Sequence, residues 1–105
     1  MRMDRQAFLQ EAAEQAAVLV PQADAALLRL LLEQAYDYVC DETRRAALER
    51  GDLGLVEELA FWRMHRLGSE GVASEQAGGV SQQFADGLPA SILRQLRRRR
   101  KVVWS

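Results

Sequence analysis

Few residues of this 105-residue chain could carry acid–base, nucleophilic or metal chemistry. His65 is the one histidine and Cys40 the one cysteine, so the chain cannot assemble a zinc site of the usual Cys/His kind by itself. The two side chains could form a nucleophile–base pair. The simpler interpretation, which we favour, makes His65 a cation at a helix end and Cys40 a small buried apolar residue.

Three acids, Asp37, Asp41 and Glu42, lie close together in the sequence. They could exchange protons or bind a hard cation, but a solvated helix face is the commoner outcome, and the sequence shows no further ligand group. The glycine-rich stretches 68–71 and 78–79 lack the lysine and the spacing of a phosphate-binding loop. The sequence therefore predicts no enzyme activity, no cofactor and no metal site.

The strongest charge feature is a run of five cations near the end of the chain: Arg97, Arg98, Arg99, Arg100 and Lys101. Such a run suits phosphates or an acidic protein groove. Trp104 follows and could anchor a contact, since Trp and Arg dominate binding hot spots. The alternative is a frayed, solvated terminus over residues 97–105.

Charge is distributed unevenly along the chain. Residues 1–60 hold 12 acids and 6 Lys or Arg, whereas residues 61–105 hold 3 acids and 8 Lys or Arg, and the net charge is −1. This asymmetry suits head-to-tail contact between identical copies, or docking of the basic end on an acidic partner. Two solvated faces would produce the same pattern.

Length and composition point to one soluble domain spanning residues 1–105. Hydrophobic residues make up 49% of the chain and charged residues 28%, as in ordinary globular proteins. No apolar run approaches the ~20 residues that span a bilayer, so we expect no membrane association. A single cysteine cannot form an internal disulfide, which fits a protein made in the cytosol.

Four helices are predicted from apolar residues that recur at three- and four-residue steps. Their expected ranges are residues 4–20, 24–43, 55–67 and 89–100. Asp4 and Asp24 are candidate N-caps, Gly68 is the expected closing residue of the third helix, and Pro89 suits the first turn of the last. The fold class is thus mostly α, a small bundle of about four helices.

The segment before the last helix, residues 68–88, holds five glycines. A structureless loop of this length is uncommon in a compact domain and is usually functional. Strand-like runs at 72–76 and 80–84 flank the glycine pair, so a short β-hairpin is the alternative to a long loop. We expect residues 68–84 of this segment to contact another molecule.

From Arg66 onward the residues follow a recognisable order: Arg66-Leu67-Gly68-Ser69-Glu70-Gly71, Ser74-Glu75, Gly78-Gly79-Val80-Ser81, Phe84, Asp86, Leu88-Pro89 and Ile92. This order and spacing resembles the signature of the head–tail connector (adaptor) proteins of tailed bacteriophages, and the resemblance covers about residues 24–101. Two departures stand out: Met64-His65 replace a common Tyr-Asn pair, and Asp86-Gly87 replaces paired aspartates.

The resemblance implies a viral structural protein rather than an enzyme. Such proteins form a ring, commonly of twelve copies, under the portal protein at the virion neck. The ring extends the channel for double-stranded DNA, which it does not bind sequence-specifically, and it presents a platform to the next neck or tail protein. Assembly would take place in the host cytoplasm.

Two contact regions follow from this implied role. Residues expected to meet a neighbouring subunit or neck component are Gly71, Val72, Gly78, Gly79, Val80, Ser81 and Phe84. Residues expected to dock on the portal are Arg97, Arg98, Arg99, Arg100, Lys101 and Trp104. The alternative function is a small nucleic-acid-binding regulator that uses the same basic tail.

Overall fold

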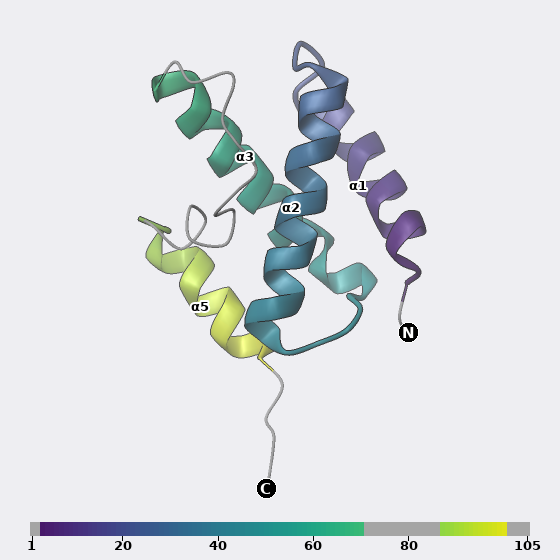
Figure 1. Ribbon diagram of the computed structural model, residues 1–105, viewed down its shortest axis with the longest axis vertical. Helices are drawn as coiled ribbons and strands as arrows, with labels where there is room; N and C mark the ends of the chain where they lie inside the picture. The colour runs from purple at the N-terminus through teal and green to yellow at the C-terminus, as the bar shows by residue number, and fades with distance from the viewer. Residues whose placement is uncertain (1–2, 71–86, 101–105) are drawn as a thin grey trace, which may run out of the picture.

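A computed structural model describes residues 3–70 and 87–100 of the chain, which are mostly helical (Figure 1). In chain order the elements are α1 (Arg5–Leu19), α2 (Ala25–Thr43), the 3-10 turn η1 (Arg50–Asp52), α3 (Leu53–Glu70) and α5 (Ala90–Arg99). No β-strand occurs in the described ranges. The mostly α fold class is confirmed, whereas the loop or hairpin expected before the last helix falls largely on residues 71–86, outside the described residues.

Helix α2 is the centre of the bundle. It packs against α1, α3 and α5, and Figure 1 shows it between α1 on one side and α3 and α5 on the other. Its apolar face is wide because it serves several neighbours: Leu32, Ala35 and Val39 have no exposed surface. A T-shaped ring contact joins α1 to α2, with the Phe8 and Tyr36 centroids 5.0 Å apart.

The ends of α2 have clear local causes. Its first turn is capped by Asp24, whose Oδ1 accepts the Leu27 N–H at 2.9 Å, as expected. The corresponding Asp4 stands at the N-cap of α1 but makes no side-chain cap bond. At the other end of α2, Arg44 adopts a left-handed conformation with φ 58°, and its N–H bonds back to the Asp41 and Cys40 carbonyls.

Helix α3 is longer than the sequence predicted. The expected closing residue, Gly68, lies inside the helix, which runs on to Glu70, so that prediction was wrong. Glycine lowers helix stability by about 1 kcal/mol relative to alanine but does not forbid helical geometry. The helix also begins earlier, at Leu53, directly after η1.

Helix α5 is attached by a narrow apolar stripe. Ile92 and Leu96 are buried, and Leu88 just before the helix is buried too. Pro89 occupies the N-cap position, one residue before the helical turn in which it was expected. Gly87 enters this turn with φ +78°, a backbone conformation that favours glycine, whereas a Cβ there would make only an ordinary contact with Arg66 Nη1 at 3.4 Å.

Among the described helices, none combines the length and the apolar character that crossing a bilayer demands.

Candidate functional site

The two groups that could have formed a catalytic pair lie on different helices. His65 is exposed on α3 and Cys40 is half-buried on α2, and no hydrogen bond joins them within the described part of the chain. Burial is the main cause that raises the pKa of the Cys40 thiol. A thiol with a raised pKa is protonated and a poor nucleophile.

The acidic cluster on α2 is a solvated helix face. Asp37 accepts two hydrogen bonds of 3.2 Å from Arg5 Nη2, and this ion pair is exposed. Asp41 and Glu42 are exposed as well. No group of three or more His, Cys, Asp or Glu side chains suited to a metal ion occurs in residues 3–70 and 87–100.

The arginines of α5 and its C-cap residue, Arg100, fall into two sets. Arg94, Arg97, Arg98 and Arg100 are exposed, and none of them pairs with an acid among the residues that the structure describes. Arg94, Arg97 and Arg98 lie three and four positions apart, so they share one helix face. We call Arg94, Arg97, Arg98 and Arg100 together the arginine face. Lys101 and Trp104 lie outside the described residues.

The arginine face borders a small hollow whose lining mixes charged and apolar side chains. This hollow, of about 190 Å³, lies between the ends of α2 and α5, lined by Glu42, Leu93, Leu96, Arg97 and Arg100. Leu93 is 37% exposed, so an apolar side chain lies beside Arg97 and Arg100, with Glu42 in the same lining. Arginine and apolar groups presented together are typical of protein-binding surfaces.

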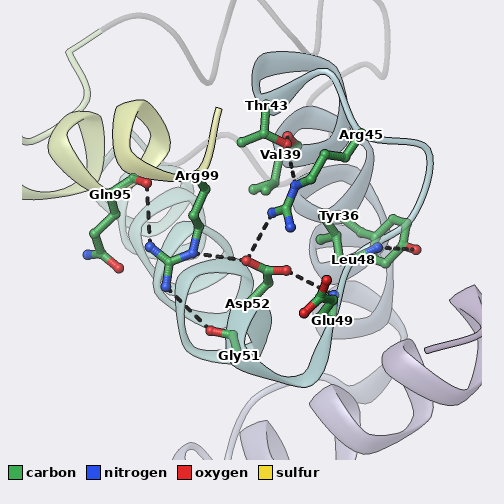
Figure 2. A network of polar contacts seen from close by, with 10 residues as sticks. All are labelled: Tyr36, Val39, Thr43, Arg45, Leu48, Glu49, Gly51, Asp52, Gln95 and Arg99. Carbon is green, nitrogen blue, oxygen red and sulfur yellow. Dashed lines mark hydrogen bonds and ion pairs between the residues drawn. The ribbon is translucent and has the colours of Figure 1, made fainter. Parts of the chain in front are cut away.

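Arg99 differs from its neighbours because its side chain turns inward to Asp52 in η1 (Figure 2). Its Nε lies 2.9 Å from Asp52 Oδ1, Nη2 donates to the Gly51 carbonyl at 3.3 Å, and Nη1 donates to the Gln95 carbonyl at 3.4 Å. Every nitrogen of the guanidinium therefore has an acceptor within the fold. Arg99 is a structural residue here and is not part of the exposed basic surface.

Asp52 holds a second arginine and a backbone amide in the same place. Arg45 Nη2 lies 3.0 Å from the same Oδ1, and the Glu49 N–H donates to Oδ2 at 2.9 Å. Only 6% of the Asp52 side chain is exposed, against 21% for Arg45 and 25% for Arg99. Burial by itself would raise the pKa of Asp52, but the bonds from Arg45, Glu49 and Arg99 outweigh it and lower the pKa below its usual value.

The network continues into the end of α2. Arg45 Nε donates to Thr43 Oγ1 at 3.3 Å, and the Thr43 hydroxyl donates to the Val39 carbonyl at 2.6 Å. We call the Asp52 carboxylate with Arg45, Arg99 and the Glu49 amide the Asp52 clamp. It joins the loop after α2, η1 and the last turn of α5.

Sequence reasoning missed the Asp52 clamp, and it treated residues 97–101 as one basic unit. No local signal connects Arg99 with Asp52, which lies 47 positions earlier. The only hint was that one acid stands between two glycines in the connection 44–54. The residues expected at a subunit interface (Gly71, Val72, Gly78, Gly79, Val80, Ser81 and Phe84) all lie outside the described residues.

Sequence reasoning also missed the buried acid Glu57 on α3. The residue is 7% exposed, and its Oε2 is buried without a hydrogen-bond partner in the described structure. Burial first, and then the charge of Glu11, raise the pKa of Glu57. Glu11 itself is ion-paired with Arg50.

Comparison with protein families gave a match over most of the chain. A family model described as phage gp6-like head-tail connector protein matches residues 12–100. The match includes α2, α3, α5, the Asp52 clamp and the arginine face. No curated protein and no solved structure matches the chain.

Proposed function

This chain belongs to the phage gp6-like head-tail connector family, and from that premise we propose that it forms a ring that docks under the portal and joins capsid to tail. Family membership itself gives a structural, non-enzymatic role at the virion neck, in contact with other virion proteins. The ring, its number of copies (about twelve) and the docking contacts are the proposed part. DNA would pass through the channel without sequence-specific contact.

The observation that carries the docking proposal is the arginine face together with the partly exposed Leu93 in the hollow beside it. Exposed guanidinium groups that pair with no acid in residues 3–70 and 87–100 can bind carboxylates of a partner. Leu93 beside them offers apolar area that a partner could bury. We therefore assign portal docking to Arg97, Arg98 and Arg100 with Lys101 and Trp104, and we remove Arg99 from the contact set.

The docking test replaces Arg97, Arg98 and Arg100 with alanine and keeps Arg99. We expect the variant to keep its helical circular dichroism and to lose co-sedimentation with purified portal. The single variant Arg98→Ala is compared with Arg44→Ala, which removes another exposed arginine that pairs with no acid among the described residues and should leave portal binding unchanged. Portal binding that survives the triple substitution would rule out this docking surface.

A second contact is proposed through residues 71–84, with Gly71, Val72, Gly78, Gly79, Val80, Ser81 and Phe84 reaching a neighbouring copy or the next neck protein. Deleting residues 72–83 should leave a folded helical protein that cannot complete particles. Infectious particles at the normal level from this deletion would refute the contact. Sedimentation of the protein with and without portal would give the ring size.

The alternative function, a nucleic-acid-binding regulator, is favoured by one observation: Arg94, Arg97 and Arg98 share a helix face and could contact successive phosphates. Because Arg99 points inward to Asp52, one fewer cation is available to contact phosphates. This function requires binding of duplex DNA by the isolated protein, with log K falling by about 0.9 per phosphate for each unit of log salt. A gel shift at two salt concentrations separates it from portal docking.

A further inference from the structure

The Asp52 clamp is placed where α5 needs support. This helix has ten residues, a length at which isolated helices are marginal in water. Its own buried side chains are Ile92 and Leu96, so two residues carry most of its apolar attachment. The last turn beyond Leu96 has no buried apolar side chain, and Arg99 is the residue of that turn that is tied to the rest of the fold.

The contacts of Arg99 fix the orientation of its guanidinium in addition to pairing its charge. A guanidinium that reaches a carboxylate, a neighbouring backbone carbonyl and a carbonyl of its own helix can satisfy all three in one orientation. Successive residues of an α-helix are turned by about 100°, so an inward Arg99 directs Arg97 and Arg98 away from the core. Both are exposed in the structure.

We propose that Asp52 is a positioning residue for docking: by holding Arg99 it fixes the last turn of α5 and so aims Arg97, Arg98 and Arg100 at an acidic surface of the partner. This inference rests on the proposed docking function and adds a residue that does not touch the partner. A rigid arginine face loses less conformational entropy on binding than a frayed helix end. Docking affinity should therefore depend on a buried carboxylate on another element.

The clamp supplies its own matched control. Arg45 and Arg99 bind the same oxygen of Asp52, at 3.0 and 2.9 Å, and are similarly buried. Only Arg99 belongs to α5, because Arg45 lies in the loop after α2. Arg45→Met and Arg99→Met remove equivalent cations, but only the second should release the helix.

The experiment compares Asp52→Asn, Arg99→Met and Arg45→Met by amide hydrogen exchange of residues 90–100 and by co-sedimentation with portal. Asp52→Asn and Arg99→Met should raise exchange at the end of α5 by about tenfold or more, because local opening sets the exchange rate. Both should weaken portal binding, and Asp52→Asn should do so although every arginine is kept. Arg45→Met should change neither exchange nor binding.

Any result other than these would contradict one part of the inference. Unchanged exchange of α5 in Arg99→Met, or equal loosening by Arg45→Met, would show that the clamp does not position the helix. Faster amide exchange of α5 together with normal portal binding would show that the position of the last turn of α5 does not affect docking. If the triple arginine variant still binds portal, the proposed docking fails, while the exchange data still decide whether Asp52 holds α5.

Discussion

The hydroxyl of Tyr36 in α2 accepts a hydrogen bond from the backbone N–H of Leu48, at 3.3 Å, and both residues are buried. Leu48 lies in the loop that leads from α2 to the Asp52 clamp, so this bond fixes the loop against the helix. Burial is the main cause that raises the pKa of Tyr36, and the bond from Leu48 opposes it. The Tyr36 ring also meets Phe8 of α1 and lies under the Arg5 guanidinium, 5.4 Å from its centroid.

Removing this hydroxyl should therefore cost stability. Tyr36→Phe keeps the ring contact with Phe8 but leaves the Leu48 N–H buried without an acceptor, which costs about 1–3 kcal/mol. We expect a lower free energy of unfolding in urea with an unchanged m-value. A loss below about 0.3 kcal/mol would mean that the amide finds another acceptor or water.

Arg44, which has a left-handed backbone conformation, is a position where a substitution should raise the free energy of unfolding. A residue with a Cβ is strained at φ 58°, and glycine is not, so Arg44→Gly should stabilise the protein by about 0.5–1 kcal/mol. Arg44→Ala is the control, since alanine keeps the strain and removes the same exposed side chain. Thermal unfolding of the two variants measures the difference, and equal melting temperatures would contradict the strain argument.

The sequence was most informative where neighbouring residues decide the structure. Leu28, Leu31 and Leu32 stand at the three- and four-residue spacing that predicted the second helix, and all three are buried. The Asp24 cap was equally local. Such features depend on spacing of three or four residues, which a sequence displays directly.

Long-range polar contacts could not be predicted in this way. Nothing near Arg99 distinguishes it from Arg98, because the difference comes from Asp52 on another element. Nothing in the sequence distinguishes Glu57 from its exposed neighbour Glu58, but α3 begins at Leu53 and turns Glu57 toward the interior. Which of several similar polar side chains is buried depends on how the helices pack, and one sequence does not contain that information.

The narrow attachment of α5 predicts a local effect of core substitution. Ile92 is 1% exposed, and Ile92→Ala should cost about 2–4 kcal/mol through lost burial and a cavity. Leu93→Ala, at a neighbouring position that is 37% exposed, should cost less than about 1 kcal/mol. Amide exchange should show that Ile92→Ala loosens residues 90–99 before α1 or α2, whereas uniform loosening would indicate that α5 unfolds only with the whole domain.

Because of Glu57, the free energy of unfolding should fall as the pH rises above 4.5. Burial and the Glu11 charge raise the pKa of Glu57 in the fold above the usual 4.5, so the folded chain keeps this proton when the unfolded chain has lost it. The stabilising contribution is complete below pH 4.5 and is lost as the pH rises through the folded pKa. Glu57→Gln, which stays neutral and can donate, should remove this loss and raise stability at pH 7 by about 1 kcal/mol.

Urea unfolding of Glu57→Gln and the parent protein between pH 5 and 7.5 measures this difference. Asp52 does not interfere, because its pKa is lowered in the fold and its contribution is lost only as the pH falls below the usual value of 3.8. Glu58→Gln is the control, since Glu58 is exposed and accepts a bond from Gln95 at 3.3 Å. The gain from Glu57→Gln should grow with pH while Glu58→Gln shows no such trend, and a gain independent of pH would mean that Glu57 is not the group that titrates.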